Sequence, residues 1–133
     1  VSLFTSDYDY KDFINLKLTE KVNKIYVHRA NDMFTWITNE DTKKWNISQN
    51  ILIEQAQRNG DRILSESKII YDTIENRKLG ILESSEYTNL KGALLLAPSM
   101  KTKVLKDFSF PFYAVIPVRD FCYVFSEEVC IYL

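Results

Sequence analysis

Few residues in this sequence have the types and spacing that chemistry requires. His28 is the only histidine, and the sequence has no Cys-x-x-Cys pair, so it carries no metal-binding motif of the usual spacing. A cysteine nucleophile needs an imidazole beside it, but Cys122 lies in the apolar run 121–125, which is typical of a buried thiol of low reactivity. The sequence therefore predicts no catalytic residue, no metal ligand and no cofactor.

Arg119 and Asp120 are the charged residues best suited to bind a ligand. They follow Pro117 and separate two apolar runs. Neighbouring residues on an extended chain point to opposite sides, so these two are not expected to pair with each other. A guanidinium is a rigid fork of donors that suits carboxylates and phosphates. We therefore expect any polar binding site to use Arg119 and Asp120, with His28 as a further candidate. The alternative is a turn braced by a salt bridge or capped by the aspartate.

Three lysines, Lys101, Lys103 and Lys106, lie on the last helix that the sequence predicts. Their spacing is typical of a solvated helix face, and the alternative is a surface that binds nucleic acid. The formal net charge is −1, whereas nucleic-acid-binding domains usually carry a basic excess, so nucleic acid is not the expected partner. A separate candidate contact for a basic partner is the acidic and aromatic segment formed by Asp7, Tyr8, Asp9, Tyr10 and Asp12.

Hydrophobic periodicity predicts the elements that position these residues. In the first part of the chain we expect a helix over residues 8–18, followed by a hairpin of two strands at 24–29 and 33–38. Asn46 or Ser48 is expected to cap the next helix.

Two residues mark the limits of that second helix. Gly60 is expected to end or loosen it, because glycine is the usual residue just beyond a helix. Trp45 precedes the helix start, so we expect its ring to be buried between the helix and the sheet.

The second half of the chain holds two segments whose type the sequence leaves open. Residues 68–75 suit a short helix or a strand. Residues 92–108 carry the strongest helical stripe, but Pro98 lies inside it and would cost about 3 kcal/mol in a helix interior. Either the helix begins at Pro98 after a strand at 92–96, or it is kinked there. Further strands are expected at 79–82, 112–116 and 121–125, and the last two have the continuous apolar character of buried strands.

These elements predict an α+β fold in one domain spanning residues 1–133, with an antiparallel sheet and helices packed on one face. We expect the two hairpins, at 24–38 and 112–125, to share that sheet. The chain has 133 residues, enough to bury a core without a metal or a disulfide. Its content of 46% hydrophobic and 26% charged residues is that of a globular protein.

The cysteines and the absence of long apolar runs favour a reducing compartment over a membrane or an extracellular location. Cys122 and Cys130 are typical of free thiols in a reducing environment. No run approaches the roughly 18 apolar residues that span a bilayer, and the N-terminus carries no visible signal peptide. We therefore expect a cytoplasmic protein without a membrane partner.

A series of short landmarks runs through the chain between residues 13 and 125: Phe13-Ile14-Asn15-Leu16, Trp45-Asn46-Ile47-Ser48, Ala56 with Asn59, Thr88-Asn89, Gly92-Ala93 and Ile116-Pro117. Their order resembles an uncharacterised bacterial family, domain of unknown function 5688. The segment 116–121 also resembles a related uncharacterised family in which a proline and an aspartate follow the penultimate strand, as Pro117 and Asp120 do here. The resemblance implies an α+β fold and a bacterial, cytosolic origin, and it implies no known activity.

The chain departs from the first family at one place. Members of that family carry two serines and a His-Glu pair after the proline, whereas this sequence has Val118, Arg119, Asp120, Phe121 and Cys122. Any role of the His-Glu pair in its relatives therefore does not transfer to this chain.

The leading hypothesis for function is a non-enzymatic, cytosolic protein-interaction domain. Aromatic residues make up 14% of the chain, which favours a thick core or an exposed aromatic face for a protein partner. An inhibitor or immunity-type accessory role, of bacterial or mobile-element origin, fits a small and nearly neutral domain. One alternative is an enzyme that binds a small molecule or nucleotide near Arg119 and Asp120, and a second is a nucleic-acid binder that uses the lysines of the last helix. An apolar surface patch would favour the first hypothesis, and a concave polar site would favour an enzyme.

Overall fold

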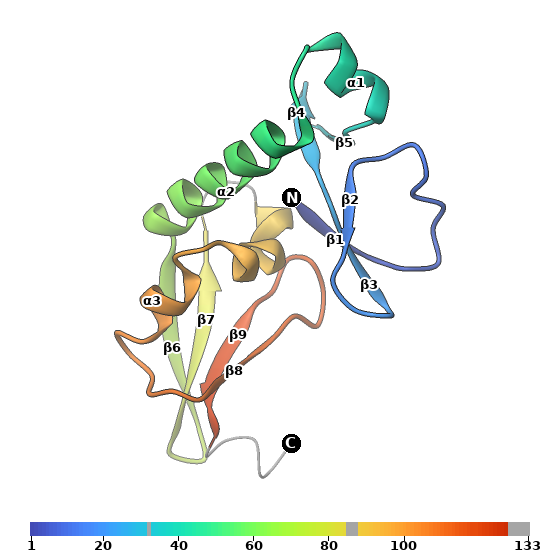
Figure 1. Cartoon of the computed structure of the whole chain (residues 1–133). Helices are drawn as coiled ribbons and strands as arrows, with labels where there is room; N and C mark the ends of the chain where they lie inside the picture. Colours follow the sequence, from blue (N-terminus) through green and yellow to red (C-terminus); the bar gives the residue numbers. More distant parts are fainter. Residues whose placement is uncertain (32, 85–87, 128–133) are drawn as a thin grey trace. The chain divides into compact units, whose positions relative to one another are not determined.

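The computed structural model describes residues 1–31, 33–84 and 88–127 (Figure 1). It combines helices with antiparallel sheets, which confirms the α+β class. The chain forms two compact units, Val1–Arg58 and Asn59–Leu133. The boundary between them falls within the longest helix, α2 (Gln49–Glu66), so this helix contributes to both units.

The first unit is built from short antiparallel strands and two helices. One sheet has the order β1-β3-β2, and a separate hairpin pairs β4 with β5. A short helix, α1, follows the hairpin and precedes α2. The bounds of the new elements are β1 Ser2–Thr5, β2 Asn15–Lys17, β3 Val22–Ile25, β4 Val27–Ala30, β5 Met33–Trp36 and α1 Asn39–Lys44.

The core of the first unit forms where the hairpin meets the N-terminal part of α2. Ile14, Tyr26 and Ile37 are buried there, and Leu52 and Ala56 of α2 pack against them. The backbone joins the same segments, because Ile14 N–H donates to Ile37 O at 2.8 Å and Tyr26 N–H donates to Ile14 O at 3.1 Å.

Two predictions of secondary structure for the first unit are wrong. Residues 8–18 form turns and β2 instead of a helix, because this segment bonds to neighbouring strands through Phe13, Ile14 and β2. The expected strand at 24–29 is divided at Tyr26, and its two halves, β3 and β4, belong to different sheets. The hairpin of β4 and β5 itself is confirmed.

The helices of this unit begin at side-chain caps. Thr38 and Asp41 form a capping box at the start of α1, a helix that is not among those predicted although the sequence contains this Thr-x-x-acid pattern. At α2, Ser48 Oγ accepts from Ile51 N–H at 3.3 Å, which confirms Ser48 as the cap. Gly60 does not end α2, because the helix continues to Glu66 and Gly60 packs against Ala97.

The second unit contains a four-stranded antiparallel sheet of order β6-β7-β9-β8 (Figure 1). Its strands are β6 Lys68–Ile74, β7 Arg77–Glu83, β8 Phe112–Val115 and β9 Tyr123–Ser126. The C-terminal part of α2, the 3-10 helix η1 (Thr88–Leu96) and α3 (Met100–Val104) cover one face of this sheet. Leu64, Leu82, Val104 and Val124 lie fully buried in the core between these two layers.

The second unit also settles the segments that the sequence left open. Residues 68–74 are a strand, and they turn into β7 through Glu75 and Asn76, whose φ angles of 49° and 64° suit a two-residue hairpin loop. Residues 92–96 belong to η1, so the expected strand there is wrong, and α3 begins after Pro98.

The prediction of one shared sheet is wrong as well. The strands that the structure describes divide into three sheets. β8 pairs with β9, and β9 pairs with β7, so neither joins the β4–β5 hairpin. Local hydrophobic pattern identifies a strand, but it does not identify the partner of that strand across the sheet.

Candidate functional site

His28 lies in β4 of the first unit, opposite Thr35 of β5. Its half-buried ring packs edge-on against the indole of Trp45, with the ring centroids 5.4 Å apart. Trp45 itself is 42% exposed, so the expectation of a buried ring is wrong. The reason is that α1 precedes it: Trp45 is the C-cap residue of α1 and does not lie directly at the start of α2.

Arg119 and Asp120 lie in the turn between β8 and β9 of the second unit, and both are exposed. The carbonyl of Arg119 accepts a 2.9 Å hydrogen bond from Gly92 N–H, which anchors the turn to η1. The anchor needs a glycine, because a Cβ at position 92 would lie 2.6 Å from Cγ2 of Ile116. The structure thus places Arg119 and Asp120 together on one turn, while His28 belongs to the other unit.

Cys122 is fully buried in the core of the second unit. Burial raises the pKa of its thiol to about 11, so the thiolate that a nucleophile requires is scarce at neutral pH. The burial of Cys122 confirms the prediction of a buried core thiol. Cys130 lies outside the described residues. Within residues 1–31, 33–84 and 88–127, no three histidine, cysteine, aspartate or glutamate side chains gather closely enough to hold a metal ion.

Two of the three lysines near α3 are occupied by contacts within their own unit. Lys103 Nζ donates to the carbonyl of Ser67 at 2.7 Å, and burial lowers the pKa of its ammonium group. Lys101 Nζ lies 4.8 Å from the ring centroid of Phe110. Lys103 therefore does not belong to a uniformly solvated helix face, and these contacts compete with any phosphate for the charged groups.

The strongest candidate for a functional surface is the second face of the four-stranded sheet. Successive side chains on a strand point to opposite faces. Ile69, Leu82, Val124 and Ala114 point into the core beneath the helices. The strand register places two rows of side chains on the opposite face, and these rows are Ile70, Ile81, Tyr123 and Val115, and Asp72, Leu79, Phe125 and Tyr113.

This opposite face is apolar and partly accessible to solvent. We call it the open face and define it by Ile70, Leu79, Ile81, Tyr113, Val115, Tyr123 and Phe125. Ile70 is 52% exposed, Val115 42% and Tyr113 39%. The exposed ring of Tyr113 stacks on the buried ring of Phe125, with the ring centroids 5.9 Å apart, so Tyr113 has a fixed neighbour. An antiparallel sheet with one solvated face normally carries polar side chains there, whereas in these two rows every side chain except Asp72 is apolar or aromatic.

The predictions from the sequence do not include this surface. The continuous apolar runs at 112–116 and 121–125 predict buried strands, and this is wrong for the exposed side chains of Tyr113 and Val115. The sequence does contain a signal for an apolar second face. Both runs are apolar or aromatic at every position, whereas a strand that only lines a core needs apolar residues at alternate positions.

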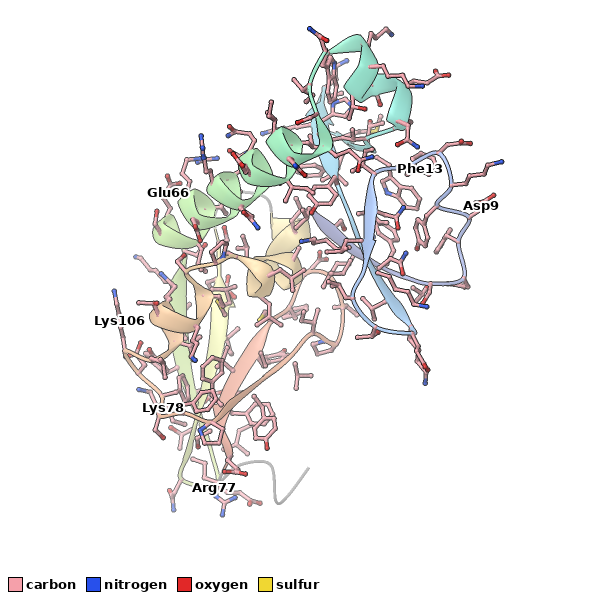
Figure 2. The ribbon with its side chains drawn as sticks, in the orientation of Figure 1. Asp9, Phe13, Glu66, Arg77, Lys78 and Lys106 are labelled. Carbon is pink, nitrogen blue, oxygen red and sulfur yellow. The ribbon has the colours of Figure 1, made fainter. Side chains whose placement is uncertain are left out.

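A second aromatic surface lies in the first unit around Trp36. The rings of Phe4, Tyr8, Tyr10 and Phe13 all contact its indole, with centroid distances between 4.7 and 5.9 Å. Tyr10 is buried, whereas Tyr8 is 53% exposed beside the exposed Asp7 and Asp9. The acidic and aromatic segment predicted from the sequence therefore exists, but it is built on turns. Figure 2 shows Asp9 and Phe13 on the loop that carries it.

Comparisons with protein-family models, with curated proteins and with solved structures find no match. No helix among the described residues is long and apolar enough to cross a membrane.

Proposed function

We propose that this chain is a non-enzymatic protein-interaction domain that binds an apolar surface of a protein partner through the open face. The observation that carries the proposal is the exposure of Ile70, Tyr113 and Val115 together on one sheet face. Contiguous exposed apolar surface on a small domain usually marks a protein contact.

The chemistry of the open face suits a protein partner better than a small polar ligand. Tyrosine and phenylalanine rings are enriched at protein interfaces, because they bury a large area and lose little conformational freedom. The stacked pairs Tyr113–Phe125 and Phe121–Tyr123 hold four rings in defined positions before any partner binds. A surface whose side chains are already ordered loses less entropy on binding.

The wider identity of the chain belongs to the same proposal. The order of sequence landmarks supports membership of the family known as domain of unknown function 5688, and the free buried Cys122 supports a cytoplasmic location. An inhibitor or immunity-type accessory role accords with a small, nearly neutral domain that presents one apolar face.

The test compares two lysine substitutions at positions of equal exposure. Val115 lies on the open face and Leu105 lies at the end of α3, and each is 42% exposed. Tagged wild type, Val115→Lys and Leu105→Lys are used as baits in extracts of the native host, and captured proteins are quantified by mass spectrometry. We expect Val115→Lys to lower recovery of the partner by about tenfold or more, as a charge in the centre of an apolar interface does. Leu105→Lys should retain the partner.

Two further measurements decide the outcome. Titration calorimetry of the recovered partner should give a negative heat-capacity change, because apolar surface is buried on binding. Equal recovery with all three baits would contradict the proposal. Loss of the partner with Arg119→Ala, at an unchanged melting temperature, would assign the site to the polar turn instead.

A further inference from the structure

The outer edge of β6 is a long strand edge with which no described strand pairs. β6 has seven residues, and among residues 1–31, 33–84 and 88–127 it pairs only with β7 (Figure 1). The opposite edge of the sheet, β8, has four residues and lies between Pro111 and Pro117. Short strands and nearby prolines protect an edge from pairing with another chain. The edge of β6 has neither protection.

The hairpin geometry identifies the backbone groups that point outward from β6. In a two-residue hairpin the closing pair, here Ile74 and Arg77, exchanges hydrogen bonds across the strands. Alternation then directs the backbone groups of Ile69, Tyr71 and Thr73 away from β7. Thr73 N–H donates to its neighbour Asp72 Oδ1 at 2.7 Å, as an outward amide can. Ile69 and Tyr71 are therefore the residues whose N–H and C=O groups are available to a further strand.

The charged side chains along this edge are complementary to those of a second, antiparallel copy of the same strand. Lys68, Ile70 and Asp72 point to the same face of the sheet, and all three are exposed. Within the described part of the chain, neither Lys68 nor Asp72 takes part in an ion pair. A lysine on an edge strand normally discourages pairing. Here an aspartate four residues later supplies its opposite charge in an antiparallel copy.

We propose that a second copy of this chain pairs antiparallel with β6, in a register centred on Ile70. This register places Lys68 opposite Asp72 of the second copy and repeats the pair by symmetry. Ile70 meets Ile70 of the second copy, and Ile69 meets Tyr71. The outward backbone groups of Ile69 and Tyr71 then complete a ladder across the twofold axis.

The neighbouring register is disfavoured by the same side chains. A register centred on Tyr71 satisfies the backbone equally well, because it also matches outward groups with outward groups. It places the carboxylate of Asp72 against Ile70 and the ammonium group of Lys68 against Ile74. Charge complementarity therefore selects the register centred on Ile70.

The resulting dimer is weak and depends on concentration. Its contact is a single strand edge, which is smaller than the roughly 800 Å² per partner of a standard interface. We expect a dissociation constant on the order of 100 μM, in the range of small and transient contacts. The dimer joins two four-stranded sheets edge to edge and does not depend on the partner proposed for the open face.

The test is a charge exchange followed by sedimentation equilibrium of the full chain between about 10 μM and 1 mM, a range set around the expected constant. Lys68→Asp and Asp72→Lys each create two like-charge contacts across the axis, and each should weaken the dimer by about tenfold or more. The double variant Lys68→Asp/Asp72→Lys restores opposite charges, so the dissociation constant of its dimer should lie within about threefold of the wild-type value. Lys106→Asp, an exposed change of the same charge on the helix side, is the control and should have no effect.

Hydrogen exchange gives a second measurement. The amides of Ile69 and Tyr71 should become protected as the protein concentration rises, because they gain partners only in the dimer. A wild type that is monomeric at 1 mM overturns the proposal. So does a dimer that resists both single reversals, a double variant that stays weak, or fast exchange at Ile69 and Tyr71 in the dimer. Val115→Lys should leave this dimer intact, which separates the result from that for the open face.

Discussion

Cys122 illustrates how burial decides the chemistry of a single side chain. It lies in the core of the second unit beside Val124 and Leu82, where the thiolate is poorly solvated. Burial therefore raises the pKa of the thiol to about 11 from its ordinary value near 9.

The raised pKa of Cys122 predicts a loss of stability in alkali. The unfolded chain releases the thiol proton near pH 9, whereas the folded chain retains it to about pH 11. The unfolded state therefore binds fewer protons between these values, and the free energy of unfolding falls as the pH rises. The thiol should account for a loss of about 2 kcal/mol by pH 11.

Urea unfolding of wild type and Cys122→Ala between pH 8 and pH 11 isolates this effect. The variant should be less stable at pH 8, because it leaves a small cavity, but its stability should fall less steeply above pH 9. Parallel curves for the two proteins would show that the thiol does not titrate in this range.

At the scale of an element, α2 shows how packing overrides a local signal. Gly60 is a residue that commonly ends helices, yet α2 continues for six residues beyond it to Glu66. The helix continues because Ile63 and Leu64, in its last turns, are buried in the core of the second unit. Tertiary packing of these two side chains outweighs the helix propensity of one glycine.

Two glycine substitutions should have opposite effects on stability. A Cβ at position 60 would lie 3.5 Å from Cβ of Ala97, an ordinary contact, so Gly60→Ala should stabilise the protein by up to about 1 kcal/mol through helix propensity. A Cβ at position 80 would lie 2.8 Å from Cγ2 of Ile69 and about 3 Å from the ring of Phe108. Gly80→Ala should therefore destabilise it by about 1–3 kcal/mol.

Thermal and chemical denaturation of the two variants check both signs in one experiment. A stabilising Gly80→Ala would mean that Ile69 and Phe108 move aside easily. A destabilising Gly60→Ala would mean that the new methyl group clashes with Ala97. The distance between the two Cβ atoms in solution would then be shorter than the 3.5 Å expected here.

At the scale of the whole molecule, the chain has two compact units, and its described residues form two core clusters. The helix α2 supplies both clusters, with Leu52 and Ala56 in the first and Ile63 and Leu64 in the second. Because one continuous helix belongs to both units, we expect them to unfold together, as a single domain over residues 1–133 would.

The matched variants Ile37→Ala and Val124→Ala test this coupling. Each removes a buried side chain from one cluster and should cost about 1–5 kcal/mol. In native-state hydrogen exchange, each variant should lower the protection of amides in both β5 and β9. If Ile37→Ala lowered protection only in the first unit and Val124→Ala only in the second, the chain would consist of two domains.

The sequence by itself determined the class of the fold and several of its elements. Apolar and β-branched runs predicted the β4–β5 hairpin, β7 and the last two strands, and Ser48, one of the two expected caps, begins α2. The apolar surroundings of Cys122 predicted a buried thiol. These features depend on residues close together in the chain, so local pattern and cap chemistry are enough to predict them.

Only the tertiary structure decided which strands share a sheet and which apolar face is left open. The sequence of residues 68–74 suits a helix or a strand, and pairing with β7 makes this segment a strand. Tyr113 and Val115 are as hydrophobic as their buried neighbours, so the sequence does not mark them as exposed. Sheet pairing joins residues that are distant in sequence, such as Leu79 and Phe125, and its free energy comes from contacts that no local window contains. The open face exists because the helices of the second unit pack on one side of its sheet. The packing of all the side chains in the core cluster determines which side that is.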